Sequence, residues 1–264
     1  MSVAESPVET LPASPPALPP RQGREPRVWK FIGTSVWGLV LFGALFAGQL
    51  AVVAYFLLTS GDTIDGKAMT ALISNGRVIS LSVVMGLPAV VLVTWIATRW
   101  SRVPFADYLA LRRPTWRMVA AGVVALILLM AGWEVVSRLA GRDSSPGFMV
   151  DVLKTAQADG ALWLLVFAFC VAAPITEEFF ARGFLYRGWS ESFLRPVGAI
   201  LLSSAVWTMM HMQYNWFFLA QVFSIGLLFG YLRYRTGSTW LTVILHGINN
   251  LAATVQTIIL ANNS

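Results

Sequence analysis

The chain has 264 residues, of which 56% are hydrophobic and only 12% are charged, and its mean hydropathy is +0.66. Soluble domains carry about 25% charged residues, so this composition excludes an ordinary soluble protein. The single cysteine, Cys170, excludes a secreted disulfide scaffold. In so apolar a chain, the net charge of +6 does not indicate a nucleic-acid partner. It indicates loop arginines that face the cytoplasmic side of a lipid bilayer.

Residues 1–30 differ from the rest of the chain. They hold seven of the 13 prolines and four basic residues, and a segment of this composition cannot bury a core. We therefore expect a disordered, proline-rich N-terminal tail with some polyproline II conformation. One transmembrane helical domain is expected to follow it, over residues 31–264.

This domain contains apolar runs long enough to cross a bilayer, which takes about 20 helical residues. A backbone in lipid must satisfy its hydrogen bonds within its own segment, so these runs are predicted to be helices and the fold to be all-α. The sequence predicts a polytopic bundle of about seven spans, at residues 31–59, 78–98, 117–137, 160–188, 197–214, 216–233 and 239–260.

The lysines and arginines predict the orientation of these spans. With the N-terminus in the cytoplasm, 13 of the 19 basic residues fall in segments on the inside and 5 in segments on the outside. This bias predicts a multi-pass protein of the cell membrane with a cytoplasmic N-terminus and an outer C-terminus. The outer segment 143–159 mixes apolar and charged residues and is predicted to form a short interfacial helix. The sequence gives no signal for an oligomeric state.

Three ionisable residues in the fourth predicted span are the strongest functional signal. A charge at the centre of a membrane helix costs about 2.5–3.5 kcal/mol, so such residues indicate a function. Glu178 and Arg182 are four residues apart, share a helix face and can neutralise each other. Glu177 lies about 100° around the helix and is left as the free carboxylate, a candidate general base. Pro174 is expected to kink the helix beside it; a purely architectural Glu–Arg clamp is the alternative.

Both histidines of the chain also lie in or at the edge of predicted spans. His246 and Asn250 share a helix face and can donate hydrogen bonds to one point, which suits a developing oxyanion. Asn249 is expected to face elsewhere and to bond a neighbouring helix. At about 1.5 Å per residue, the predicted boundaries place His211 roughly 9 Å beyond mid-bilayer, on the side opposite Glu177 and His246. If these side chains are to meet, the fifth span must be tilted or displaced, or its predicted ends must be wrong.

These residues form three short motifs, each on a separate hydrophobic helix. They are Glu-Glu-x-x-x-Arg at 177–182, an aromatic-x-x-x-His at 207–211 and His-x-x-x-Asn at 246–250. The set resembles the CAAX-processing and bacteriocin-processing intramembrane endopeptidases, known as the CPBP or Abi family. The resemblance covers the motif-bearing core, residues 160–260. The second motif of the family usually begins with phenylalanine, and here Trp207 replaces it at what we interpret as a packing position.

The resemblance implies an intramembrane endopeptidase that acts on a membrane-tethered peptide or protein, with a prenylated CAAX-type protein among the candidate substrates. The site residues that it implies are Glu177, His211, His246, Asn250, Glu178 and Arg182. By this resemblance, Glu177 activates a water molecule with help from His211. His246 and Asn250 stabilise the oxyanion of the scissile peptide, and the Glu–Arg pair holds the helix and positions the first glutamate.

No cofactor is expected from the sequence. The family is often labelled as metalloproteases, and histidine and glutamate are ligands that zinc accepts. The chain contains no His-Glu-x-x-His pair, and the roles above need no metal, so a metal is not favoured. The sequence also lacks Gly-x-Ser-x-Gly and Gly-x-Gly-Asp, and no aspartate falls in a predicted span. A rhomboid-like serine mechanism or a presenilin-like aspartyl mechanism is therefore disfavoured.

Two other functions stay open at this point. Buried carboxylates and histidines also build proton relays, so a proton-coupled transporter is one alternative. Paired discontinuous helices or symmetry between two halves would favour it, and the sequence shows neither. A non-catalytic membrane scaffold or bacteriocin-immunity protein is the other alternative, although the complete set of site residues argues against lost catalysis.

Overall fold

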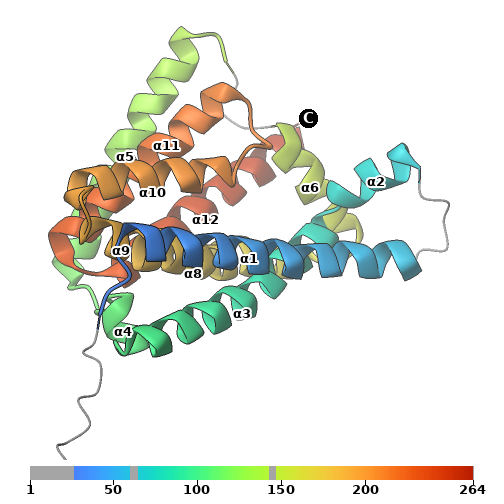
Figure 1. The fold of residues 1–264 in the computed structure, drawn as a ribbon. Coiled ribbons are helices and arrows are strands. Elements are labelled where there is room, and N and C mark those ends of the chain that lie inside the picture. Colours follow the sequence, from blue (N-terminus) through green and yellow to red (C-terminus); the bar gives the residue numbers. More distant parts are fainter. Residues whose placement is uncertain (1–26, 60–64, 143–146, 264) are drawn as a thin grey trace, which may run out of the picture.

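The structure, a computed structural model, describes residues 27–59, 65–142 and 147–263, and these residues fold entirely into helices and their connections (Figure 1). Most of the predicted tail, residues 1–26, lies outside the described part. The elements are α1 (Phe31–Thr59), α2 (Gly66–Ile73), α3 (Gly76–Ser101), α4 (Phe105–Tyr108), α5 (Trp116–Leu139), α6 (Gly147–Ala158), α7 (Leu162–Phe167), the π-helical segment η1 (Ala168–Ala172), α8 (Ala173–Glu178), the π-helical segment η2 (Phe179–Leu185), α9 (Tyr186–Ser190), α10 (Arg195–Met209), α11 (Trp216–Thr236) and α12 (Thr239–Asn263).

The predicted all-α membrane fold is confirmed. Within the described residues, five helices are long and apolar enough to cross a membrane: α1, α3, α5, α11 and the continuous run Leu162–Ser190, which we call the central helix. The two remaining predicted spans correspond to α10 and α12. With 15 residues, α10 is about 22 Å long, shorter than the ~30 Å of a hydrocarbon core. The count of seven spans therefore stays a prediction.

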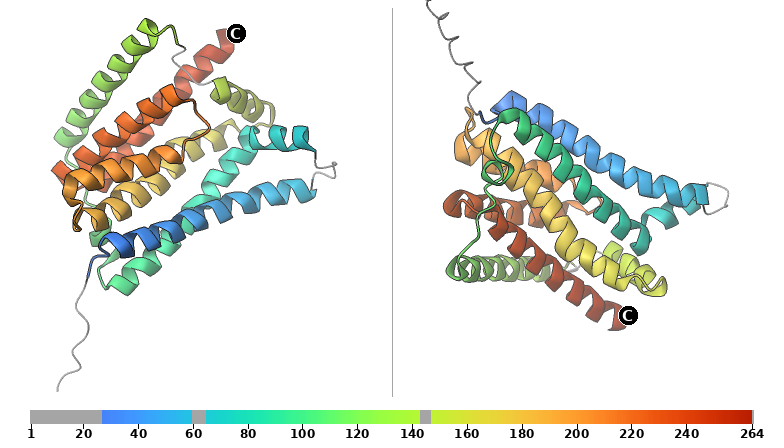
Figure 2. Two further views of the ribbon diagram at one scale, coloured as in Figure 1. Left: turned by 45° about the horizontal axis from the view of Figure 1, so that its top comes forward. Right: turned by 90° about the horizontal axis from the view of Figure 1, so that it is seen from below.

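The central helix, which comprises α7, η1, α8, η2 and α9, passes through the middle of the bundle. α1 and α3 pack against each other on one flank, and α10, α11 and α12 lie on the other, with α5 at the outer edge against α11 and α12 (Figures 1 and 2). In its most apolar stretch, 56% of the central helix is buried by protein, against 11% for α1 and for α5. Charged side chains are tolerated in this helix because protein, rather than lipid, surrounds them.

Local sequence signals fix several helix ends. Asn75, Thr115 and Asn215 are N-caps, and their side chains accept hydrogen bonds from backbone N–H groups in the first turns of α3, α5 and α11. At the other end of α11, Gly237 adopts a left-handed conformation with φ of +65°, and its N–H bonds to the carbonyl of Arg233. This turn lets α12 begin only two residues later.

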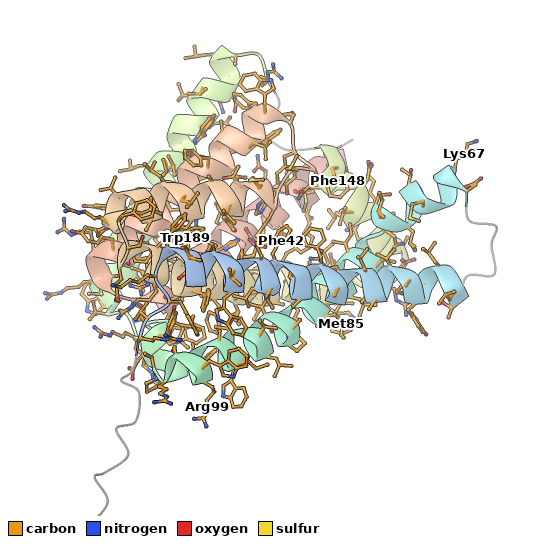
Figure 3. All side chains as sticks on the ribbon, in the orientation of Figure 1. Phe42, Lys67, Met85, Arg99, Phe148 and Trp189 are labelled. Atoms are coloured by element: carbon orange, nitrogen blue, oxygen red, sulfur yellow. The ribbon has the colours of Figure 1, made fainter. Side chains whose placement is uncertain are left out.

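The connections between helices gather at two opposite ends of the bundle. At one end the Ser238 hydroxyl donates to the carbonyl of Arg112 over 2.6 Å, and Arg27 N–H bonds to the carbonyl of Ser101. At the other end the amide of Asn75 donates to Asp159 over 2.9 Å. Figure 3 labels Arg99 at the former end of α3, far from Lys67 on α2. α6 lies within the predicted interfacial segment, whereas α2 and α4 were not expected.

Candidate active site

The end of α10 brings the first histidine into the site. The helix stops at Met209 rather than continuing to residue 214, so the predicted end of the fifth span is wrong. His211 lies in the following turn, where its N–H bonds to the carbonyl of Thr208 and its ring Nδ1 lies 3.0 Å from the carbonyl oxygen of Trp207. Because the chain leaves the helix here, the imidazole turns back toward the central helix, and the expected mismatch in depth disappears.

Glu177 is the point on which three side chains converge. Its Oε2 accepts a hydrogen bond of 2.6 Å from the indole Nε1 of Trp207. The same oxygen lies 3.9 Å from Nε2 of His211 and 4.0 Å from Nε2 of His246. These groups come from the central helix, the end of α10 and α12, so the structure brings together residues that are up to 69 positions apart in the sequence.

Glu178 has entirely different surroundings. Its Oε1 accepts hydrogen bonds from Arg182 over 2.9 Å and pairs with Nδ1 of His246 over 3.0 Å. The side chains of both members of this Glu–Arg pair are 0% exposed, whereas Glu177 is 18% exposed. Arg182 also donates to the carbonyl of Gly226 over 3.2 Å and stacks its guanidinium 4.4 Å from the ring of Trp207. The predicted i,i+4 pair therefore forms, and only Glu177 can meet a substrate or water.

The partners of the two imidazoles determine where their hydrogens lie. Nδ1 of His211 faces a carbonyl oxygen and Nδ1 of His246 faces a carboxylate oxygen, and both of these oxygens can only accept. Each Nδ1 therefore carries a hydrogen. The Nε2 atoms of both rings are left to face Glu177.

A π-helical turn explains the position of Asn250. In η1 the N–H of Ala173 bonds to the carbonyl of Ala168, five residues earlier. The carbonyl of Phe169 would then need the N–H of Pro174, which proline lacks. The Asn250 amide supplies the missing donor over 2.8 Å. Pro174 therefore acts through this freed carbonyl, and Asn250 ties α12 to the central helix while it keeps a second amide hydrogen.

A cavity of about 550 Å³ lies beside these groups, a size typical of sites for small ligands or peptide segments. The cavity is lined by Glu177, Trp207, His246 and Asn250. Asn249 also lines it, although it was expected to face away from these residues. The amide of Asn249 donates to Asn250 over 3.4 Å, so it belongs to the same polar wall.

Tyr214 lines the same cavity from the turn after α10. Its ring lies 6.0 Å from the ring of His211. Burial, together with the negative charge of Glu177, raises the pKa of the Tyr214 phenol to about 12. The phenol therefore stays protonated at neutral pH and presents a neutral hydroxyl to the cavity.

The sequence did not predict the role of Trp207 in the site. It was interpreted as packing in place of a phenylalanine, and it is indeed buried, at 3% exposed. Its indole N–H, however, holds the carboxylate of Glu177. The signal was available, since an indole carries a donor that a phenyl ring lacks, but only the fold shows which acceptor it reaches.

Histidine and glutamate side chains meet in the site, so their grouping bears on metal binding. Within the part of the chain that the structure describes, no group of three or more His, Cys, Asp or Glu side chains is placed to hold a metal ion. The Glu177 oxygen that faces both imidazoles already accepts the Trp207 hydrogen bond, and the facing oxygen of Glu178 is bound by Arg182.

Comparison with known families agrees with this geometry. Residues 159–252 match the model of the family described as type II CAAX prenyl endopeptidase Rce1-like. Neither the curated proteins nor the solved structures give a significant match. The matched residues comprise the central helix, α10, α11 and the first half of α12, and they carry all three motifs. The resemblance to the CPBP family is confirmed over residues 159–252, which are similar to the Rce1-like family of CAAX proteases.

Proposed function

We propose that the chain is an intramembrane endopeptidase that hydrolyses a peptide bond of a membrane-tethered, CAAX-type substrate. The observation that carries this proposal is the approach of two imidazole Nε2 atoms to one oxygen of Glu177, at 3.9 and 4.0 Å, beside a cavity. Distances near 4 Å are too long for direct hydrogen bonds and suit groups that share a small polar molecule such as water.

In the proposed reaction Glu177 is the general base, assisted by His211. Glu177 takes a proton from the water molecule as the water oxygen bonds to the scissile carbonyl carbon. When the C–N bond of the tetrahedral intermediate breaks, the protonated carboxyl returns this proton to the leaving amine. The products are a new carboxyl terminus and a new amino terminus, and no other reactant is needed.

The oxyanion of the intermediate would be stabilised by Nε2–H of His246 and by the second amide hydrogen of Asn250. Nε2 donates only when the imidazole is doubly protonated. The buried Glu178 carboxylate, 3.0 Å from Nδ1 of the same ring, accepts from that nitrogen and so orients Nε2 toward Glu177. Arg182 prevents Glu178 from being left as an uncompensated buried charge. The Glu–Arg pair is thus proposed to position the site rather than to touch the substrate.

The test is Glu177→Gln, which keeps the shape of the side chain and an oxygen for the Trp207 indole but removes the base. We expect cleavage of an internally quenched, farnesylated CAAX peptide in detergent micelles to fall by about 10²–10⁴-fold, with an unchanged thermal unfolding midpoint. The matched control is Glu134→Gln, because Glu134 pairs with Arg138 at the protein surface. Wild-type rates in Glu177→Gln would refute the mechanism.

A further inference from the structure

Arg233, in the last turn of α11, is a buried cation without a paired anion. It is 5% exposed, and its Nε donates to the hydroxyl of Thr239 over 3.0 Å. Among the residues that the structure describes, its two terminal nitrogens have no hydrogen-bond acceptor, and no carboxylate forms an ion pair with it. Buried charges in proteins are normally paired. Arg182, which is also buried, has Glu178 as its partner, so the two arginines differ in this respect.

Hydrogen bonds between two connections hold the Arg233 side chain in place. The hydroxyl of Thr239 accepts from Arg233 and donates to the carbonyl of Leu109 over 2.5 Å. The hydroxyl of Ser238 donates to the carbonyl of Arg112 over 2.6 Å. These bonds join the turn between α11 and α12 to the connection between α4 and α5. The guanidinium is therefore positioned in advance, which lowers the entropic cost of binding a ligand.

Two further guanidinium groups lie near Arg233. Arg187 in α9 and Arg112 between α4 and α5 are both close enough for their charges to act on it. The ring of Tyr186 lies 5.3 Å from the guanidinium carbon of Arg233. Nη1 of Arg112 lies beside the turn at Gly237, 3.8 Å from the position that a Cβ would take there. Three elements thus bring three like charges together, at the left of Figure 1.

Arg187 is only partly neutralised. Its Nη2 pairs with Glu191 over 2.7 Å, and the two side chains are 35% and 42% exposed. Its Nε, in contrast, is buried and has no hydrogen-bond partner within the described part of the chain. A buried donor without an acceptor is rare in folded proteins and calls for an explanation. The unpaired groups of Arg187 and Arg233 have the same one, namely an anion that both of them bind.

These arginines lie where the helices end. Arg187 and Arg233 occupy the last turns of α9 and α11. Trp116, which begins α5, and Tyr234 are 75% and 51% exposed, and exposed aromatic side chains are typical of the membrane–water interface. The positive-inside rule predicts that this end faces the cytoplasm, where the leaflet carries anionic phospholipids.

We infer that Arg112, Arg187 and Arg233 form a binding site for a phosphate group, which we call the arginine site. A phosphate carries negative charge on several acceptor oxygens, so it can accept hydrogen bonds from guanidinium groups in different directions. The interfacial position favours the headgroup of an anionic phospholipid as its source, and a free phosphate ion is the other source. The arginine site is separate from the cavity beside Glu177, because none of its residues is among the described residues that line that cavity.

The arginine site is tested by lipid binding to the full-length protein in dodecyl maltoside. Dioleoyl phosphatidylglycerol is titrated in, and bound lipid is counted by native mass spectrometry. For Arg233→Met we expect the affinity of the tightest lipid to fall by about tenfold, because charge-assisted hydrogen bonds are lost. Binding of phosphatidylcholine, whose headgroup has no net charge, is expected to stay the same. Wild-type affinity for phosphatidylglycerol in Arg233→Met overturns the inference.

Arg112→Gln tests the arginine site without changing a buried side chain, because Arg112 is exposed. We expect its affinity for phosphatidylglycerol to fall by about fivefold. The matched control is Arg113→Gln, which removes the same charge from the next, equally exposed position, and we expect a change within about twofold. Equal losses in the two variants would show that only the overall surface charge matters, and would overturn the inference.

Glu191 competes with the ligand for Arg187, so its removal should strengthen binding. We expect Glu191→Gln to bind phosphatidylglycerol about threefold more tightly, since an exposed ion pair no longer has to be broken. Asp107→Asn is the control, because it removes the same charge from an exposed residue of α4. A merely structural arginine cluster predicts no gain in Glu191→Gln, and an equal gain in both variants would also contradict the site.

Thermal unfolding in detergent free of phospholipid separates the two sources of phosphate. A ligand that binds only the folded protein raises the unfolding midpoint. A rise with phosphatidylglycerol but not with inorganic phosphate, lost in Arg233→Met, assigns the lipid headgroup. A rise with inorganic phosphate that the same variant loses assigns the free ion. No response of the wild type to either probe overturns the inference. None of these measurements uses cleavage, so their outcome is independent of the proposed function.

Discussion

Glu177 and Glu178 are neighbours in the chain, yet they lie on two faces of the central helix with opposite surroundings. The cavity face offers Glu177 a neutral indole donor and partial exposure. The buried face offers Glu178 a guanidinium, an imidazole and no exposure. A buried carboxylate whose charge is balanced by a paired cation helps to hold the fold together rather than to react. A carboxylate held by one neutral donor beside a cavity keeps its capacity to take a proton.

The comparison predicts that changes on the buried face cost stability. Arg182→Met leaves the Glu178 charge buried without its cation, and we expect the free energy of unfolding to fall by about 3–5 kcal/mol. The matched control is Arg138→Met, which removes the cation of a similar i,i+4 pair whose side chains are 78% and 39% exposed. Exposed pairs contribute about 0–1 kcal/mol. Equal losses in denaturant titrations of the two variants would refute the distinction between the two faces.

The cavity face depends on close contact between α12 and η1. A Cβ at Gly247 would lie 2.7 Å from the carbonyl oxygen of Cys170, so Gly247→Ala must push the helices apart. We expect a loss of about 1–3 kcal/mol in unfolding free energy, with a larger loss of peptidase rate, because His246 and Asn250 move with the helix. Gly132→Ala on α5 is the control, since nothing lies within 4 Å of its Cβ. Full activity in Gly247→Ala would contradict the contact.

The indole of Trp207 is expected to fix the orientation of Glu177. Its N–H holds one carboxylate oxygen over 2.6 Å, so Trp207→Phe leaves that oxygen without its donor and lets the carboxylate rotate away from the two imidazoles. We expect the peptidase rate to fall by about tenfold, which corresponds to the loss of about one hydrogen bond.

The matched control for this change is Trp189→Phe. Trp189 is 5% exposed, and its indole donates to the hydroxyl of Ser35 over 3.1 Å, away from the cavity. Figure 3 labels it beside α1. We expect Trp189→Phe to keep the wild-type rate. A wild-type rate in Trp207→Phe would show that the indole only packs.

Metal removal gives the smallest expected effect. The carboxylate oxygens that face the histidines are already engaged by Trp207 and Arg182, so dialysis against 1,10-phenanthroline should leave the cleavage rate unchanged. A loss of activity that added zinc restores would contradict this prediction and would place a metal among the residues of the cavity face.

Local rules predicted the parts of this molecule that depend on neighbours in the sequence. The apolar runs predicted the helices, and the spacing of Glu178 and Arg182 predicted their ion pair. The short α10 was overestimated because Met210, Met212 and Tyr214 are apolar enough to prolong a span. The hydrogen bonds of Trp207 and Asn250 were not predictable, because their acceptors lie on another helix and one of them is freed only by the π-helical turn.

The π-helical segments η1 and η2, one on each side of α8, carry a further consequence. A π turn holds one residue more than an α turn, and one residue corresponds to about 100° of rotation around a helix. Deleting a single residue from η1 would rotate α8, so that its side chains face a different part of the bundle although the sequence of α8 is unchanged. Transplanting the Glu-Glu pair into another scaffold therefore requires matching the length of the segment before it as well as the motif.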